Sequence, residues 1–579
     1  MWSSAWLSLV SLALTALHVR SEPKIADLAM EDYFVWDLPV PEAMPNLTHY
    51  AGMFELDHEK SANMFFWLWP KQNESGANEK LIVYLNGGPG CSSEESLFLE
   101  NGPIRMDLKY PDTVQLNEAS LNSYASVLYV DQPLGTGYSY VLTDSLDHTL
   151  KEVTDHFMKF MEKFFATFEN YKNADLYLMG RGFSGVYISY FAHEMLERNV
   201  KASPLRYNLR GIAIGNGWID PLNQYRSYYD YSVEKKLLDQ EGQESAKLAV
   251  DKCDQAQLAN NVRIRTPVCE QLLQLILDHS VVTENGVMSC IDQYDIQNRD
   301  SYPRCGLGGP AESANMTSYL RMIRVIQSLH IPNAQLFGWT ACNGHVSNAL
   351  GSDPTPDAPI KLFPSLLSQI PVLLYSGAQS LVYNHLGTEA SIANLEWGGA
   401  KGMEDAEEEI WTINGTRVGT WKHARNLTYA LIDRAGFLAG HGEGQYAVLN
   451  MMNRFMGVSP NWAAGLPATV GNETPPASSS GYGLVGGGYV TLGTVLGIAL
   501  AFLVVSVVAW ALLRKRKKDK GKFKSLAEQG YEDEPNEMDE LVIDSSEFFN
   551  EDEDDIEEAE DTDDEHGRRH QPGSSHSQA

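Results

Sequence analysis

The sequence lacks the motifs by which metal, cofactor and nucleic-acid sites are usually recognised. It has no Cys-x-x-Cys spacing, no glycine-rich phosphate loop and no patch in which basic and aromatic residues alternate. We therefore expect no metal, no cofactor and no nucleic-acid partner. Basic residues are also scarce, because 44 Lys and Arg stand against 76 Asp and Glu, which gives a formal net charge of −32.

Cysteine is scarce too, with six residues in a chain of 579. An even number in an oxidising compartment favours three disulfides. Six cysteines allow 15 pairings, so the residues alone do not say which ones pair. The cysteines are Cys91, Cys253, Cys269, Cys290, Cys305 and Cys342.

Long apolar runs are few, and two of them predict targeting to a membrane. The first, at residues 5–17, is too short to cross a bilayer and predicts a signal peptide over residues 1–21, with a buried N-terminal helix as the alternative. The second, at residues 490–513, can span a bilayer and is followed at once by basic residues at 514–518. We therefore expect a single-pass type I membrane protein whose N-terminal part is lumenal.

The glycosylation acceptors agree with this orientation, because every Asn-x-Ser/Thr triplet precedes the predicted span. Residues 466–489 are rich in Pro, Ser and Gly, which predicts a flexible stalk between a lumenal domain at 22–465 and the span. The predicted acceptors are Asn46, Asn73, Asn315, Asn414, Asn426 and Asn472.

The segment after the span, residues 514–579, is strongly acidic, with 22 Asp and Glu against 10 Lys and Arg. Such a run repels itself and has little apolar surface to bury, so we expect a disordered cytoplasmic tail. It is either a solvated extension or a sorting tail. In the sorting interpretation, adaptor proteins bind Tyr531 and Phe548-Phe549, and phosphorylation of Ser545 and Ser546 adds charge.

The lumenal part alternates apolar strands with helical segments, as a largely parallel α/β sheet requires. Four strands are predicted to end in loops rich in glycine and polar residues, and in open α/β sheets such loops meet at one crevice. Residues 222–360 are more helical and hold four of the cysteines, which predicts a cap inserted over that crevice. The four strands are 81–85, 127–130, 211–214 and 371–375.

Residues 176–187 predict a strand, a sharp elbow and a helix. In α/β-hydrolases such an elbow carries the nucleophile at its tip, with small residues two places before and after it. Gly180 and Ser184 are the small residues here, and Gly182 stands at the tip. Gly182 has no side chain, so the sequence predicts the fold of a hydrolase without its nucleophile.

Several motifs resemble those of the serine carboxypeptidases, which are secreted α/β-hydrolases that remove one residue from the C-terminus of a peptide. The matching segments are Asn86-Gly87-Gly88-Pro89-Gly90-Cys91-Ser92-Ser93, residues 131–140, the elbow, residues 215–221 and Ala439-Gly440-His441. The added span and acidic tail resemble the membrane-anchored carboxypeptidase D type, which in fungi removes Lys and Arg from kexin-processed pheromone precursors in the late Golgi. The resemblance implies an α/β-hydrolase fold with a helical cap.

The resemblance also places the catalytic triad, and two of its three positions have changed. The nucleophile falls at Gly182, the aspartate at Ser380 and the base at His441. A triad needs an attacking oxygen, an imidazole and a carboxylate that orients it, so we expect little or no activity. Rescue by the hydroxyl of Ser184 or Ser380 is the alternative.

The binding groups implied by the resemblance are better preserved. The backbone N–H groups of Gly88 and Phe183 would form the oxyanion hole. Asn86, Gly87 and Glu100 fall where relatives bind the terminal carboxylate of the substrate. The glutamate of the family elbow is Arg181 here, which either binds a carboxylate directly or pairs with Glu100 and fills the site.

The resemblance further implies the disulfide pairs Cys91–Cys342, Cys253–Cys269 and Cys290–Cys305. The resulting hypothesis is a catalytically silent homologue in the trans-Golgi network or the late secretory or vacuolar pathway, which still binds peptide or protein C-termini. An active or residual carboxypeptidase that trims basic residues is one alternative. A glycosylated scaffold that acts through cytoplasmic sorting adaptors bound to its tail is the other.

Overall fold

The computed structural model describes residues 29–476 apart from several short gaps, which are 42–43, 45–46, 75–77, 111–112, 202–204, 260–261, 333–337, 352 and 354–356. The predicted signal peptide, transmembrane segment, cytoplasmic tail, most of the stalk and Asn46 lie outside these residues. Among the helices within the described ranges, none is both long enough and apolar enough to cross a bilayer.

A mixed sheet of 12 strands organises the described residues, in the order β1-β2-β6-β3-β7-β8-β12-β17-β16-β15-β19-β18. The six strands from β6 to β17 run parallel, and antiparallel strands flank them on both sides. The parallel strands are β6 (Ser126–Val130), β3 (Lys80–Leu85), β7 (Asp175–Arg181), β8 (Leu209–Gly215), β12 (Val372–Gly377) and β17 (Leu427–Ile432). The predicted strands in this region are therefore confirmed, within a sheet that is parallel only at its centre.

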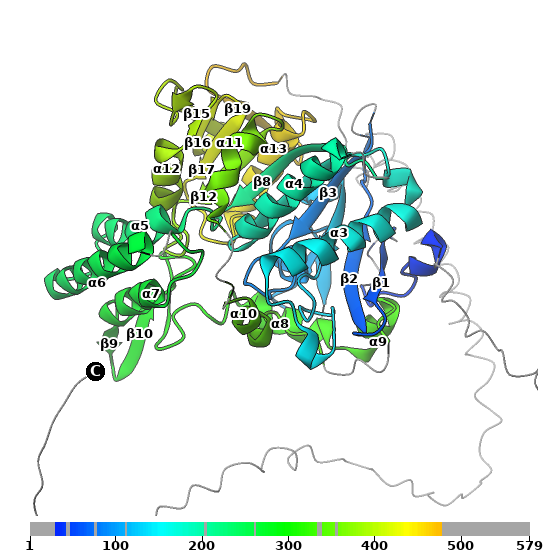
Figure 1. Cartoon of the computed structure of the whole chain (residues 1–579), viewed down its shortest axis with the longest axis horizontal. Coiled ribbons are helices and arrows are strands. Elements are labelled where there is room, and N and C mark those ends of the chain that lie inside the picture. The colour runs from blue at the N-terminus through cyan, green and yellow to red at the C-terminus, as the bar shows by residue number, and fades with distance from the viewer. Residues whose placement is uncertain are drawn as a thin grey trace, which may run out of the picture. The chain divides into compact units, whose positions relative to one another are not determined.

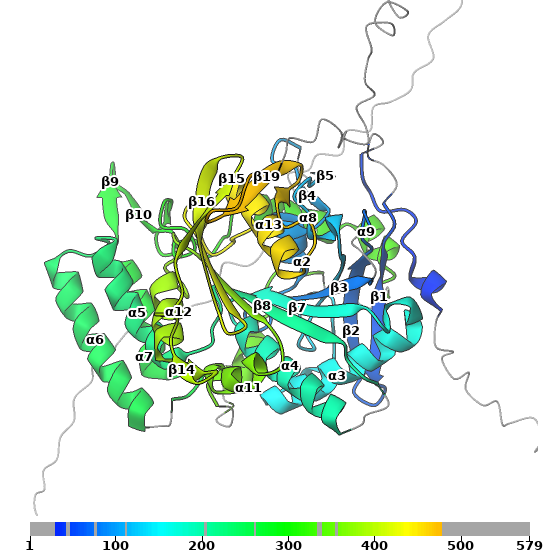
Figure 2. The same ribbon diagram turned by 90° about the horizontal axis from the view of Figure 1, so that it is seen from above.

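Helices cover both faces of the sheet, which is why its central strands are unbroken apolar runs. On one face lie α3 (Leu150–Thr167), α4 (Ser184–Val200) and α11 (Phe363–Leu367), and on the other lie α2 (Glu94–Ser96) and α13 (Gln445–Phe455), as Figure 2 shows. The two faces bury separate cores, one containing Phe157, Phe164 and Phe191 and the other containing Tyr84 and Met451.

The antiparallel strands extend the sheet at both of its edges. On one side they are β1 (Tyr50–Asp57) and β2 (Ala62–Trp69). On the other side they are β16 (Thr416–Ala424), β15 (Glu409–Ile413), β19 (Leu466–Val470) and β18 (Trp462–Ala463). Strand β19 pairs with β15, so residues 466–470 belong to the sheet and not to the predicted stalk. Pro467 is compatible with this because it lies near the start of β19, where the strand register includes only β18, and proline is tolerated at such peripheral positions of a sheet.

The chain between β8 and β12 includes residues 222–360, where a cap was predicted. It begins with three helices, α5 (Pro221–Glu234), α6 (Gln240–Ala259) and α7 (Pro267–His279), which lie together beside α12 (His385–Asn394) in Figure 1. A three-stranded sheet follows, which the sequence did not indicate, and then three short helices. These elements are β9 (Val282–Glu284), β10 (Val287–Ile291), β11 (Arg299–Ser301), α8 (Glu312–Leu320), α9 (Ile323–Ser328) and α10 (Gly344–Gly351).

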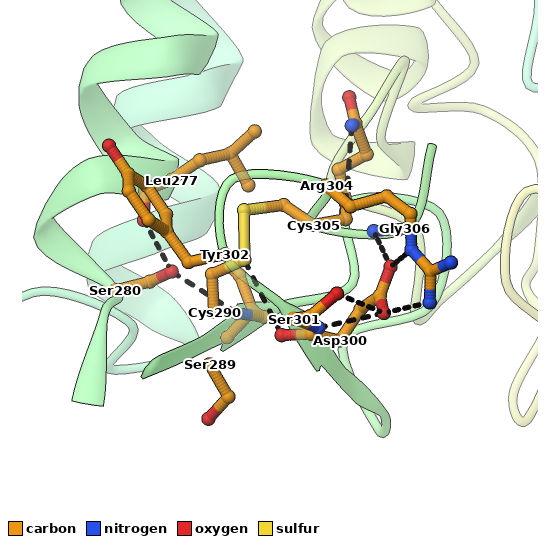
Figure 3. Close-up of a disulfide and its surroundings, with 12 residues drawn as sticks. Leu277, Ser280, Ser289, Cys290, Asp300, Ser301, Tyr302, Arg304, Cys305 and Gly306 are labelled. Atoms are coloured by element: carbon orange, nitrogen blue, oxygen red, sulfur yellow. Dashed lines mark hydrogen bonds and ion pairs between the residues drawn. A yellow bond between two sulfur atoms is a disulfide. The ribbon is translucent and has the colours of Figure 1, made fainter. Parts of the chain in front are cut away.

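The disulfide Cys290–Cys305 joins β10 to the turn that follows β11 (Figure 3). Asp300 strengthens the same turn, because its carboxylate accepts hydrogen bonds from Arg304 Nη2 at 2.6 Å and from the N–H of Gly306 at 2.9 Å. The bonds from Arg304 are the main reason that the pKa of Asp300 lies below its ordinary value. The other disulfides are Cys91–Cys342 and Cys253–Cys269, so the three pairs are those that the resemblance implied.

Candidate active site

The elbow between β7 and α4 is formed, and Gly182 stands at its tip with φ +63°. The Gly182 N–H donates to the carbonyl of Gly215 at 3.0 Å, and the Gly182 carbonyl accepts from the N–H groups of Gly185 and Trp218 at 3.0 and 2.9 Å. The left-handed conformation costs glycine nothing, whereas other residues adopt it only under strain. The sharp turn of a nucleophile-bearing elbow thus persists around a residue that has no side chain.

The glycine-rich loop after β3 packs directly against this elbow. A β-carbon on Gly87 would lie 2.5 Å from the backbone nitrogen of Phe183 and 2.8 Å from the carbonyl oxygen of Arg181. Only glycine allows the two backbones to approach so closely. The disulfide Cys91–Cys342 holds the end of the loop, and the N–H groups of Gly88 and Phe183 lie on the two segments that meet here.

Aromatic side chains cover the tip of the elbow. A β-carbon on Gly182 would lie 2.8 Å from Cζ of Phe437 and 3.4 Å from Cε2 of Tyr383. The ring centroid of Phe437 is 5.2 Å from that of Tyr294 and 6.1 Å from that of Tyr383, which is in turn 5.1 Å from that of Trp218. We call these four residues, Phe437, Tyr383, Tyr294 and Trp218, the aromatic plug.

The two hydroxyls of the plug are not available as bases at neutral pH. Burial raises the pKa of Tyr294 to about 12 and that of Tyr383 above its ordinary value. Both tyrosines therefore remain protonated, and the plug offers the tip an apolar surface. Neither tyrosine nor Phe437 was foreseen in the sequence as part of the site.

His441, expected in the position of the base, makes a different contact. Its Nε2 lies 3.4 Å from Oε1 of Glu312 in α8, and its side chain is 36% exposed. The hydrogen bond with Glu312 is the main reason that the pKa of His441 lies above its ordinary value. The three atoms nearest to a β-carbon on residue 182 belong to Phe437 and Tyr383, and none belongs to His441.

A general base must lie within hydrogen-bond reach of its nucleophile. The ring of Phe437 lies next to the tip of the elbow, and His441 is not among the nearest neighbours of that tip. The sequence contains Ala-Gly twice, at Ala435-Gly436-Phe437 and at Ala439-Gly440-His441. Only the second copy ends in histidine, and this copy was matched to the base.

The serines considered as substitutes are both engaged with main-chain carbonyls. Ser184 Oγ donates to the carbonyl of Arg181 at 2.9 Å, and Ser380 Oγ donates to the carbonyl of Val382 at 2.7 Å. Both serines are fully buried. Each hydroxyl therefore stabilises its own loop, and neither has an imidazole as its hydrogen-bond acceptor in these contacts.

Arg181 is buried next to the tip, between two carboxylates. Its Nε lies 2.7 Å from Oε1 of Glu100, and its Nη2 lies 2.6 Å from Oε2 of Glu95. The guanidinium also lies over the ring of Phe437, 4.7 Å from its centroid. Burial alone would lower the pKa of Arg181, but the two glutamates raise it, so the side chain stays charged.

The other residues expected to bind a carboxylate surround this ion pair. Asn86 Nδ2 donates to Oε2 of Glu95 at 2.9 Å, and the N–H of Gly440 donates to Oε2 of Glu100 at 3.1 Å. The structure thus brings Asn86, Glu100 and Arg181 together, and it adds Glu95, which sequence reasoning missed. Of the two possibilities weighed for Arg181, pairing within the chain is the one observed.

A second pair of carboxyl groups lies beneath the glycine-rich loop. Glu94 and Asp131 are both fully buried. Asp131 accepts backbone hydrogen bonds from Ser93 and Tyr138 at 3.0 and 2.8 Å, whereas Oε2 of Glu94 lies 2.5 Å from Oγ of Ser92. Burial, followed by the charge of Asp131, raises the pKa of Glu94 well above its ordinary value. Burial also raises the pKa of Asp131, which its hydrogen bonds with Glu94 and with the backbone of Tyr138 and Ser93 counteract.

The glycosylation acceptors within the described residues lie at the surface. Asn73, Asn414, Asn426 and Asn472 are exposed, and Asn315 is half-buried. The use of these sites for glycosylation remains a prediction from the sequence.

A strand, elbow and helix beside a glycine-rich loop at the carboxyl ends of parallel strands is the arrangement of an α/β-hydrolase. The family model described as serine carboxypeptidase matches residues 39–457. The chain belongs to the serine carboxypeptidase family.

Named relatives are similar over most of their length. The chain is 38% identical over 491 residues to the pheromone-processing carboxypeptidase of Colletotrichum graminicola, covering 82% of this chain and 77% of the relative. It is 39% identical over 467 residues to that of Pyricularia oryzae, covering 79% and 73%. The crystal structure of a prohormone-processing carboxypeptidase from Saccharomyces cerevisiae matches with a TM-score of 0.69 and 29% identity, covering 74% of this chain and 96% of that one.

Proposed function

We propose that this chain is a non-catalytic member of the serine carboxypeptidase family that recognises carboxylates. The observation that carries the proposal is the contact between Phe437 and Gly182, because a β-carbon at the tip would lie 2.8 Å from the phenyl ring. The elbow has lost its nucleophile, and the space in which a base would accept the proton is filled by an apolar ring. Together with Ser380 in place of the aspartate, all three triad positions are then inert.

A residual carboxypeptidase that trims basic residues is the alternative from the enzyme class. It would need a hydroxyl within hydrogen-bond reach of an imidazole. In the described part of the chain, Ser184 and Ser380 donate to carbonyl oxygens, and the side-chain partner of His441 is Glu312 and neither serine. An attacking serine would have to break its bond and also displace the plug, which argues against this alternative.

Recognition of a carboxylate is what the remaining groups can still do. Arg181 keeps its charge, and Asn86 supplies an amide donor beside it. A guanidinium and an amide are suitable donors for the C-terminal carboxylate of a peptide or protein. The relatives are named for pheromone and prohormone processing, so proteins of the secretory pathway are the partners we propose, in the trans-Golgi network or a later compartment.

The scaffold alternative places the function in the acidic tail, which lies outside the described residues. Deletion of residues 514–579 separates it from carboxylate recognition. If loss of function followed the tail and ignored Arg181 and Asn86, the folded domain would serve only as a glycosylated platform.

The central experiment is an assay of peptide hydrolysis by the full chain, purified in a mild detergent because the sequence predicts a membrane span. Peptides ending in Lys or Arg are incubated with the protein, and the released amino acid is measured by mass spectrometry. We expect no release above that of the buffer. Turnover by the unmodified chain that disappears in the His441→Ala variant would refute the proposal.

A further inference from the structure

Glu95 is held by the two groups that would bind a ligand's carboxylate. Its Oε2 accepts from Arg181 Nη2 at 2.6 Å and from Asn86 Nδ2 at 2.9 Å. These donors come from two separate segments, Arg181 from the end of β7 and Asn86 from the loop that follows β3, and they converge on a single carboxylate oxygen. The side chain of Glu95 thus presents to Arg181 and Asn86 the same chemical group that a peptide C-terminus carries.

The two glutamates beside Arg181 differ in how firmly they are held. Glu100 is 4% exposed in its side chain, and it accepts from Arg181 Nε at 2.7 Å, from Ser96 Oγ at 3.0 Å and from the N–H of Gly440 at 3.1 Å. Glu95 is 19% exposed in its side chain, which places it at the open side of the cluster. Glu100 is therefore the fixed counter-ion of Arg181, and Glu95 is the replaceable one.

The charges of Arg181 and its two glutamates also indicate that a ligand has to replace Glu95. One guanidinium and two carboxylates leave a surplus negative charge, which repels any further carboxylate that approaches. The face of the guanidinium that lies over Phe437 is covered, so a ligand has to meet its edge, where Glu95 already lies. A ligand must then displace Glu95 and cannot simply add to the site.

We propose that Glu95 is a built-in carboxylate that closes a binding site for peptide C-termini. The site consists of Arg181 Nη2 and Asn86 Nδ2, and it opens when the side chain of Glu95 leaves. This inference rests on the proposed function, since it names the regulation of the same carboxylate site. It makes the resting protein a weak binder and the displacement of one side chain the step that permits binding.

Removal of Glu95 tests the inference directly. The full chain and its Glu95→Ala variant are titrated against a fluorescein-labelled hexapeptide with a free C-terminal carboxylate and against the same peptide with a C-terminal amide, with anisotropy as the readout. We expect the native chain to bind both peptides weakly, with a preference for the free acid well below tenfold. The Glu95→Ala variant should bind the free acid at least about tenfold more tightly than the amide, because two charged or polar donors have lost their acceptor.

Three further variants make the result specific. Glu95→Ala combined with Arg181→Ala should lose the preference for the acid. Glu95→Gln, which keeps the shape of the side chain and removes its charge, should show a smaller preference of the same sign, and it serves if the alanine variant does not fold. Glu407→Ala, at an exposed glutamate, is the matched control and should behave as the native chain.

A second, smaller probe tests whether the size of the hexapeptide prevents binding, since the aromatic plug limits the room around the tip of the elbow. N-acetylglycine and N-acetylglycine amide are compared by the shift that each causes in the melting temperature. Equal affinity of both Glu95 variants for acid and amide with both probes would overturn the inference, and so would a native chain that already prefers the acid tenfold. Neither result depends on hydrolysis, so failure here is distinct from failure of the non-catalytic proposal.

Discussion

The ring of Phe437 lies against Gly182, at 2.8 Å from the point where a β-carbon on residue 182 would be. A serine at the tip therefore requires the ring of Phe437 or the backbone of the elbow to shift. This relationship joins two positions that are 255 residues apart in the sequence, and the first two predictions follow from it.

Restoring a serine at the tip is expected to destabilise the fold. Gly182→Ser forces a side chain into the left-handed region and into the Phe437 ring, which together should cost at least about 2 kcal/mol of unfolding free energy. Chemical denaturation measures this loss. Gly457→Ser is the matched control, because Gly457 has φ +69° with nothing within 4 Å of its β-carbon, so it reports the backbone cost alone.

The steric part can be isolated with a double-mutant cycle. Phe437→Ala should recover at least about 1 kcal/mol of the loss in the Gly182→Ser background, beyond what the two single changes predict. Additive effects would mean that the two residues do not compete for space.

Rebuilding the triad should require a histidine at 437. We expect Gly182→Ser with Ser380→Asp to remain inactive although His441 is present. Addition of Phe437→His should raise the hydrolysis of a p-nitrophenyl ester by roughly 100-fold or more over that pair, the usual contribution of a general base. Release of p-nitrophenol is the measurement. An active double variant that His441→Ala silences would place the base at 441 instead.

The pair of His441 and Glu312 should make stability depend on pH. The pKa of His441 is raised and that of Glu312 is lowered, mainly by their mutual hydrogen bond. The folded state holds the proton of His441 more tightly than the unfolded state, so the contribution is complete below about pH 6.5. It is lost as the pH rises through the raised pKa of His441, and also as the pH falls through the lowered pKa of Glu312.

The contribution of this pair to the unfolding free energy is small, because the side chain of His441 is 36% exposed and solvent screens its charge. We expect Glu312→Gln to lower the unfolding free energy at pH 6 by less than about 1 kcal/mol and to change it little at pH 9. Glu443→Gln, which removes an exposed partner of Arg434, is the control and should have no such dependence. An equal loss at both pH values would exclude a role for the charge of His441.

The buried pair of Glu94 and Asp131 predicts a pH dependence at higher pH. The raised pKa of Glu94 means that the folded state retains a proton that the unfolded state has already released above about pH 4.5. Stability should therefore fall as the pH rises from there to the folded-state pKa, by up to about 1.4 kcal/mol for each pH unit.

A glutamine at position 94 has no group that titrates between pH 5 and pH 8. Glu94→Gln should remove that decline and be more stable than the native chain at pH 8, as measured by urea denaturation at pH 5 and pH 8. Glu118→Gln, at an exposed glutamate, is expected to follow the native profile. If Glu94→Gln instead destabilised the protein equally at both pH values, Glu94 would act through its shape alone.

The sequence revealed most of the scaffold, because its signals are local. The parallel strands are short runs of consecutive apolar residues, as in β3 and β7, and buried strands of a parallel sheet must be apolar on both faces. The elbow could be recognised from its small residues and its place between a strand and a helix. Strand β19 was missed because its Pro467 and small residues have the composition of a linker, and only its pairing with β15 shows otherwise.

The identities of two residues at a recognisable turn already show that the tip of the elbow has no side chain and that an arginine stands beside it. Which ring faces that tip, and which carboxylates surround that arginine, follow from the folded chain. The reason is that Phe437, Glu95 and Arg181 reach one another through the packing of segments that are distant in the sequence. The spacing of residues along a chain does not specify how two loops approach each other, so this part of the site became visible only in three dimensions.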